Sequence, residues 1–247
     1  MKRILCALCC FAAAALAQQN TCSSLESGVE AEVLRVRVAK DDLGAFRAVG
    51  DKALSALRLC PQSARLWYLA ARSAEVLESP SNGQAFAAEG GLKRIVADAL
   101  SHAPSSAPAA TVAARVQGSS SLARKALALD PNYQPARRAL AELLAKEGAI
   151  DEALRLASAK TPSGPMHLTR AHVLLAAKRP AEAVAEARKI VTPGEPDEFS
   201  PAVEMYRDKQ EVLGFALLDL QKTAEARKAL RAAAAAGSVA AQHYLAK

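Results

Sequence analysis

The chain has 247 residues, of which 51% are hydrophobic and only 4% aromatic, and its formal net charge is +7. Alanine and leucine supply much of the apolar fraction. Such a composition favours closely packed helices and argues against a sheet, because strands prefer β-branched and aromatic side chains. The sequence therefore predicts an all-α fold. Charges of both signs alternate along the expected helices, which is typical of solvated helix faces and argues against a nucleic-acid-binding surface.

The N-terminus has the pattern of a cleaved export signal. Lys2 and Arg3 precede an apolar run at 4–16, and the run ends in an Ala-Leu-Ala triplet at Ala17. This run is too short to cross the core of a bilayer, which needs roughly 20 residues. We therefore predict a signal peptide over residues 1–17 and cleavage after Ala17, not a membrane anchor.

Cleavage would leave a periplasmic or secreted protein that starts at Gln18 and does not span a membrane. Its net charge would fall from +7 to +5, because Lys2 and Arg3 leave with the signal and no acidic residue does. Residues 18–24 are expected to form a short tail before the helical region at 25–247. Nucleic acid is not an expected partner in that compartment, whereas an anionic lipid or envelope polymer stays open as a ligand.

Cys22 and Cys60 are the two cysteines that remain after cleavage. In an exported protein such a pair can form a disulfide. A bridge across this sequence separation would stabilise the fold by roughly 4 kcal/mol in the chain-entropy model. The alternative is two separate thiols, with Cys22 on a loose terminus and Cys60 packed at a helix end. Sequence alone leaves both open, because it does not show whether the sulfurs meet.

Helical patterns punctuated by prolines follow along the chain. One phrase recurs, in "SALRLCPQS" (55–63), "ADALSHAPS" (97–105) and "RKALALDPN" (124–132). Proline cannot continue a helix, so each phrase ends one helix and begins a turn. The pattern predicts helix pairs and a lone capping helix, at 25–60, 64–103, 107–129, 134–160, 165–191 and 201–236 and from 238. It also indicates irregular insertions near 79–91, 101–121 and 192–201.

The middle insertion allows two interpretations. The segment 101–121 leaves too few residues for a full pair with helices of ordinary length. One interpretation is a shortened, degenerate pair, because 109–117 keeps helical spacing. The other is a linker between two short arrays.

Small residues recur twelve positions apart in the second half of the chain. The three pairs are Ala141 and Ala153, Ala171 and Ala183, and Gly214 and Ala226. Two antiparallel helices can approach closely only where their facing positions carry little side chain. In this spacing and in the proline-ended phrases, the chain resembles the tetratricopeptide repeat family. The resemblance implies a helix-turn-helix solenoid, a right-handed superhelix of about five to six pairs with a terminal capping helix.

The resemblance also implies a non-catalytic scaffold or adaptor that binds a protein or peptide in a groove lined by first helices. The positive charge expected there favours an acidic or C-terminal segment as ligand. The alternative is that the same positions are merely solvated. The expected groove positions are Arg65, Tyr68, Arg72, Glu75, Arg138, Glu142, Lys146, His172, Glu211, Phe215 and Asp219.

No motif in the sequence supports an enzyme, a cofactor or a metal site. His167 and His172 are five apart and do not share a helix face, and the zinc, nucleophile-elbow and phosphate-loop motifs do not occur. A second hypothesis places function in the insertions, around Asn82, Glu195 and Asp197. There the protein would bind an anionic polymer or lipid, or serve as an accessory to an enzyme.

Overall fold

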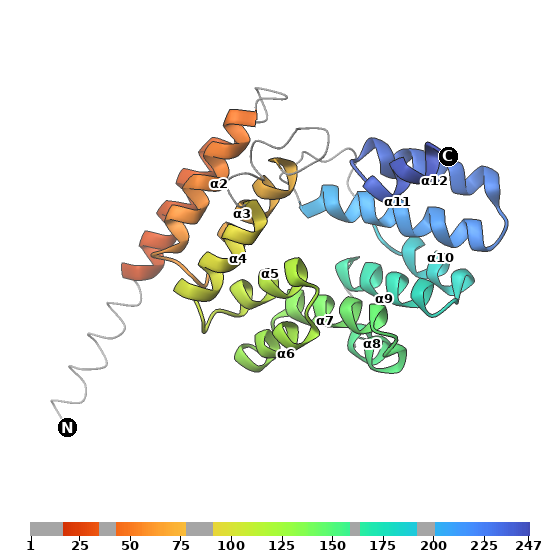
Figure 1. Ribbon diagram of the computed structural model, residues 1–247, viewed down its shortest axis with the longest axis horizontal. Coiled ribbons are helices and arrows are strands. Elements are labelled where there is room, and N and C mark those ends of the chain that lie inside the picture. The colour runs from red at the N-terminus through yellow and green to blue at the C-terminus, as the bar shows by residue number, and fades with distance from the viewer. Residues whose placement is uncertain (1–16, 35–42, 78–90, 159–163, 192–200) are drawn as a thin grey trace. The chain divides into compact units, whose positions relative to one another are not determined.

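The structure is a computed structural model that describes residues 17–34, 43–77, 91–158, 164–191 and 201–247. These residues form helices joined by short turns, with no strand among them, so the predicted all-α fold is confirmed (Figure 1). The chain divides into two compact units, Met1–Val116 and Gln117–Lys247. Residues 1–16 of the expected signal at 1–17 and the loop residues Asn82, Glu195 and Asp197 lie outside the described residues.

The first unit contains an N-terminal helix at residues 17–34 and four further helices. Within this unit α3 packs on both α2 and α4. The core is formed mainly by aliphatic side chains, and α3 buries Leu66 and Leu69 completely. The four helices are α2 (Leu43–Leu57), α3 (Ala64–Leu77), α4 (Gly91–His102) and α5 (Ala107–Gln117).

The expected tail at 18–24 is instead part of the N-terminal helix. No proline or glycine occurs between Ala17 and Ser27, so nothing in the local sequence ends the helix there. Because polar residues dominate these first turns, they lack the apolar periodicity from which a helix would be predicted. Further along the same helix, Val29 and Val33 are fully buried.

The proline-ended phrase at 55–63 makes a turn that joins three helices of the first unit. The carbonyl oxygen of Pro61 accepts a hydrogen bond from Trp67 Nε1 at 2.9 Å and another from Ser106 Oγ at 2.6 Å. These bonds connect the end of α2 to α3 and to the start of α5. Both bonds are partly buried, and a carbonyl that is shielded from water without a partner costs about 1–3 kcal/mol.

The second unit consists of eight helices in its described part. The division falls between Val116 and Gln117, so the two helices of the expected pair at 107–129 belong to different units, and α6 packs on α7. The eight helices are α6 (Ser120–Leu129), α7 (Gln134–Lys146), α8 (Ile150–Ala157), α9 (Gly164–Ala176), α10 (Pro180–Arg188), α11 (Pro201–Asp219), α12 (Thr223–Ala235) and α13 (Val239–Leu245).

One turn design recurs at the ends of α7, α9, α11 and α12. Each of these helices is followed by one residue with positive φ: Gly148 at 84°, Lys178 at 58°, Gln221 at 59° and Gly237 at 88°. The amide of that residue bonds to the carbonyl three residues back, and the next amide bonds to the carbonyl five back. This is the Schellman motif, which satisfies the last carbonyls of a helix and reverses the chain. It places each following helix directly against the previous one.

The helices of the second unit pack in a regular order. Three pairs form between neighbours in sequence, α7 with α8, α9 with α10 and α11 with α12, and each pair contacts the helix that follows it. The first helices of successive pairs also pack on one another, α7 on α9 and α9 on α11. Within the described ranges, the second helices α8, α10 and α12 make no comparable contact with one another. Ala141, Ala153, Ala171, Ala183 and Ala226 are completely buried in this packing.

Candidate functional site

The first helices α7 and α9 are joined by a polar bridge at the predicted groove positions. Arg138 Nε donates a hydrogen bond to Thr169 Oγ1 at 3.2 Å, and Thr169 Oγ1 donates to Glu142 Oε1 at 2.8 Å. Thr169 is completely buried, so the bridge lies partly beneath the surface. Arg138 and Glu142 therefore help to hold the helices together. No sequence pattern pointed to Thr169, because its partners Arg138 and Glu142 come from another helix pair.

Two other predicted groove residues hold the terminal helix in place. Ser238 Oγ donates to Glu211 Oε2 at 2.5 Å, and the rings of Phe215 and Tyr244 meet edge to face with centroids 6.1 Å apart. Ser238 is also the N-cap of α13. Phe215 was expected at a groove position, and the structure packs its ring against α13 and its neighbours. The contact depends on the tertiary fold, so the repeat pattern did not reveal it.

Three predicted positions of the second unit stay available to a partner. Lys146 and Asp219 are exposed and His172 is half-buried. None of the three forms a hydrogen bond or ion pair within the described part of the chain. Lys146 ends α7, His172 lies in α9 and Asp219 ends α11, so each first helix contributes one such residue.

The groove positions predicted in the first unit lie along α3. Arg65 Nε is 2.6 Å from Glu30 Oε1, and the Arg65 guanidinium lies 5.3 Å from the centroid of the Tyr68 ring. Arg65 therefore ties α3 to the N-terminal helix. Arg72 is half-buried, and the side chain of Glu75 lies outside the described part. These four residues belong to the first unit and the other seven to the second.

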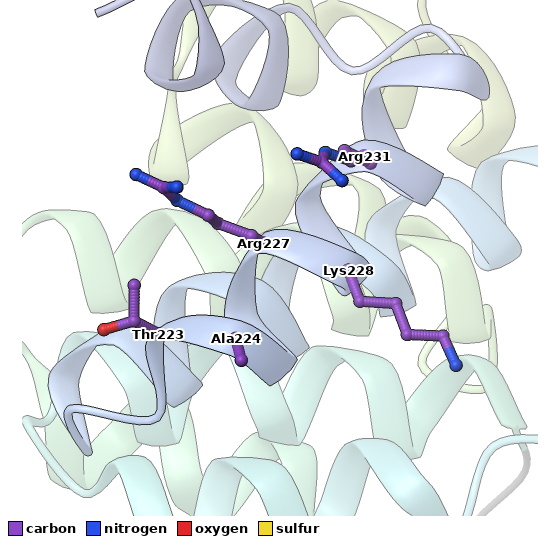
Figure 2. A pocket seen from close by; sticks show the side chains of 5 residues that line it. All are labelled: Thr223, Ala224, Arg227, Lys228 and Arg231. Carbon is purple, nitrogen blue, oxygen red and sulfur yellow. The ribbon is translucent and has the colours of Figure 1, made fainter.

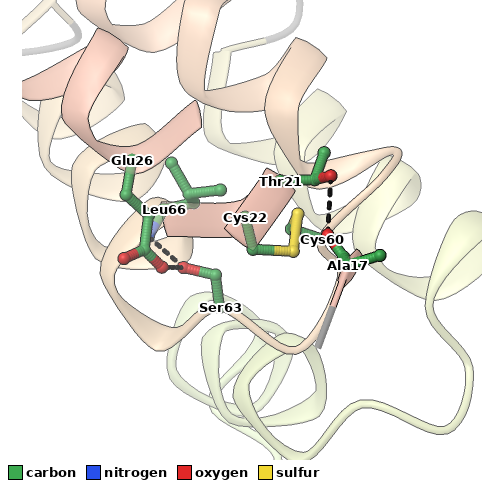
Figure 3. The surroundings of a disulfide bond; sticks show 7 residues. All are labelled: Ala17, Thr21, Cys22, Glu26, Cys60, Ser63 and Leu66. Carbon is green, nitrogen blue, oxygen red and sulfur yellow. Dashed lines mark hydrogen bonds between the residues drawn. A yellow bond between two sulfur atoms is a disulfide. The ribbon is translucent and has the colours of Figure 1, made fainter. Parts of the chain in front are cut away.

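A disulfide joins Cys22 to Cys60, with a Cα–Cα distance of 5.7 Å (Figure 3). Of the two alternatives left open by the sequence, the structure has the bridge. One helical turn further along, Glu26 accepts a hydrogen bond from Ser63 Oγ at 2.5 Å. Ser63 Oγ in turn accepts from the Leu66 amide at 3.1 Å and so caps the start of α3.

The bridge is one member of a stripe on the N-terminal helix. Cys22, Glu26 and Glu30 are spaced four apart and share one helix face. Cys22 is bonded to Cys60, which follows α2. Glu26 contacts Ser63 just before α3, and Glu30 contacts Arg65 in the first turn of α3. We call these three contacts the N-terminal clasp.

A half-buried ionic cluster lies between α9 and α10. Glu186, only 5% exposed, accepts hydrogen bonds from Lys189 Nζ at 2.6 Å and His167 Nδ1 at 2.9 Å, and Arg170 Nε lies 3.9 Å away. Burial by itself raises the pKa of Glu186, but the two hydrogen bonds and the positive charges of Lys189 and Arg170 outweigh it. The pKa of this carboxyl is therefore lower than its ordinary value.

A hollow of about 540 Å³ lies on the outer side of α12 (Figure 2). The described residues that line it are Thr223, Ala224, Arg227, Lys228 and Arg231. All five are exposed. None of these residues is among the groove positions predicted from the sequence.

The described residues show neither a metal centre nor a membrane span. No group of three or more histidine, cysteine, aspartate or glutamate side chains in these ranges could hold a metal ion. None of the helices covered by the structure is both long and apolar enough to cross a bilayer. No protein-family model matches the chain, and no curated protein is significantly similar to it.

Proposed function

We propose that this protein is an exported, non-catalytic scaffold built from helix pairs similar to tetratricopeptide repeats. It binds a protein or peptide on the surface formed by α7, α9 and α11, which we call the first-helix surface. The observation that supports the proposal is the packing of α7 on α9 and of α9 on α11, without comparable contacts among the described second helices. Such packing makes the first-helix side the inner, continuous side of a stacked array.

The size of this surface suits a short extended segment. Neighbouring packed helices lie about 8–10 Å apart, so three first helices span about 20 Å between the outer axes. An extended chain rises about 3.3 Å per residue and would cross them with roughly six residues. Stacks of helix pairs commonly bind partners along such concave surfaces.

The charges on this surface favour one orientation of the bound segment. Lys146 on α7 and Asp219 on α11 are exposed and of opposite sign, with His172 on α9 between them. An acidic or C-terminal group of the partner would lie near Lys146, where a charge-assisted hydrogen bond can form. A basic group would lie near Asp219.

Photo-crosslinking from the first-helix surface tests the proposal. A photoreactive amino acid at position 172 should give a discrete adduct with one protein in living cells. The control position is Arg155 on α8, whose side chain is 79% exposed and which belongs to a second helix. Adducts from position 155 and none from position 172 would contradict the proposal.

A further inference from the structure

The outer face of α12 carries three basic side chains without partners among the residues that the structure describes. Arg227, Lys228 and Arg231 form no hydrogen bond or ion pair with any residue that the structure describes. Like charges one turn apart on a helix repel each other, so the fold gains nothing from Arg227 and Arg231 standing together. Their proximity therefore does not stabilise the fold, and their hydrogen-bond donors are available to a ligand.

The acidic residue of the same helix does not neutralise them. Glu225 is the acid in α12 and it pairs with other cations, Arg188 Nη2 at 3.6 Å and Lys222 Nζ at 3.9 Å. The opposite face of α12 is fully used in packing, where Ala226, Leu230 and their neighbours are buried. The basic face is thus separate from the surfaces that hold the fold together.

The spacing of the two arginines along α12 matches that of alternate side chains in an extended ligand. Arg227 and Arg231 point to the same side of α12, and Lys228 points to the other (Figure 2). Four helical residues advance about 6 Å along the axis. In an extended chain, alternate side chains point the same way and repeat about every 6.6–6.8 Å. Two carboxylates separated by one residue can therefore reach both guanidinium groups, each of which can bind a carboxylate through two hydrogen bonds.

We propose that the outer face of α12 is a second binding site, for an extended acidic segment of a partner protein with carboxylates at alternate positions. Ala224 leaves room for the backbone of such a segment, and the Thr223 hydroxyl adds a donor at the edge of the hollow. A membrane surface fits less well, because α12 exposes no large apolar side chain that could enter a bilayer. This site lies on a second helix and does not depend on the first-helix surface.

Fluorescence anisotropy with labelled peptides tests the site. The first peptide carries four glutamates at alternate positions, and the second has the same composition with the four glutamates in one block. We expect tighter binding of the alternating peptide. The double variant Arg227→Gln with Arg231→Gln should weaken its binding on the order of tenfold, because two charge-assisted contacts are lost.

The matched control removes two other exposed arginines. Arg58 and Arg115 lie in the first unit and have no side-chain partner in the described ranges, so Arg58→Gln with Arg115→Gln changes the net charge equally. An equal loss of affinity in both double variants would overturn the proposal, and so would equal affinity for the two peptides. Vesicles containing phosphatidylglycerol form a third arm. Binding to vesicles that depends on Arg227 and Arg231, without binding of either peptide, would assign the face to a membrane and overturn the proposal.

Discussion

Substitution of Gly214 by alanine tests the close contact between α11 and α12. An added Cβ would lie 2.5 Å from Leu230 Cγ, 2.6 Å from Leu230 Cδ2 and 3.3 Å from the Leu230 backbone nitrogen. Carbon atoms in van der Waals contact lie about 3.5–4.0 Å apart. The two helices would therefore have to separate by about 1 Å at this point, or Leu230 would have to leave its rotamer. Leu230 is completely buried, so it has no free space to enter.

The expected loss of stability is the difference between two effects. Overpacking of a filled core costs about 1–3 kcal/mol. Replacing glycine by alanine inside a helix contributes up to about 1 kcal/mol in the opposite direction. We expect Gly214→Ala to lower the free energy of unfolding by about 1–2 kcal/mol.

Urea unfolding followed by far-UV circular dichroism measures this loss. Gly28→Ala is the control, because a Cβ there has Lys52 Cε as its nearest neighbour, 4.0 Å away, so this change should stabilise by up to about 1 kcal/mol. In a Leu230→Ala background the two side-chain clashes are gone and the 3.3 Å contact with the backbone nitrogen of residue 230 remains, so Gly214→Ala should destabilise less than it does in the unaltered protein. A midpoint that rises in Gly214→Ala as it does in Gly28→Ala would refute the packing argument.

Four further predictions address the turns, the bridge, the ionic cluster and export. Lys178→Gly should stabilise by about 1 kcal/mol in urea unfolding, because φ of 58° is unfavourable for residues other than glycine, and a lower midpoint would contradict this. Reduction of the bridge between Cys22 and Cys60 should cost roughly 4 kcal/mol in the chain-entropy model, and equal urea midpoints with and without reductant would exclude that contribution. The depressed pKa of Glu186 means that its stabilising contribution is complete above the ordinary carboxyl pKa and is lost as pH falls through the folded value. Glu186→Gln should therefore weaken the acid sensitivity of the urea midpoint, and an unchanged pH profile would count against the cluster. Intact-mass measurement of protein recovered from the cell envelope should give a chain that begins at Gln18, whereas retention of residues 1–17 would overturn the predicted cleavage.

The helical architecture was predictable because small residues and proline-ended phrases are local signals. Ala141, Ala153, Ala171 and Ala183 were singled out by their spacing, and all four are completely buried. Gly214 was also singled out, but the side chain closest to it is Leu230. Spacing indicates that a position must be small, whereas the residue opposite depends on how the helices cross.

The turns were only partly predictable. Gly148 occupies the left-handed position that favours glycine, yet Lys178 and Gln221 adopt similar angles. Single-residue signals for a helix end rely on glycine or asparagine. The hydrogen bonds and packing of these turns therefore override the local preference of lysine and glutamine.

The candidate site was predictable only as a surface, because residue roles depend on partners distant in sequence. Arg65 and Glu30 meet across two helices, and Glu211 meets Ser238 of the terminal helix. Lys146 remains exposed and forms no ion pair or side-chain hydrogen bond in the described part of the chain. No pattern within a single helix shows whether such a residue will pair with another helix or stay exposed.

One matched pair of charge reversals tests the central claim most directly. The quantity to measure is the affinity of each variant for the protein partner that is found by crosslinking at position 172. Lys146→Glu changes the end of α7, on the first-helix surface, and Arg155→Glu makes the same change of charge on α8 of the same pair. Both side chains are exposed, so each change should shift the urea midpoint only slightly, with the larger shift in Arg155→Glu because Arg155 Nη2 lies 4.0 Å from Glu152 Oε1. If the partner binds on the first-helix surface, its affinity should fall on the order of tenfold in Lys146→Glu and change little in Arg155→Glu. A loss confined to Arg155→Glu would contradict the claim.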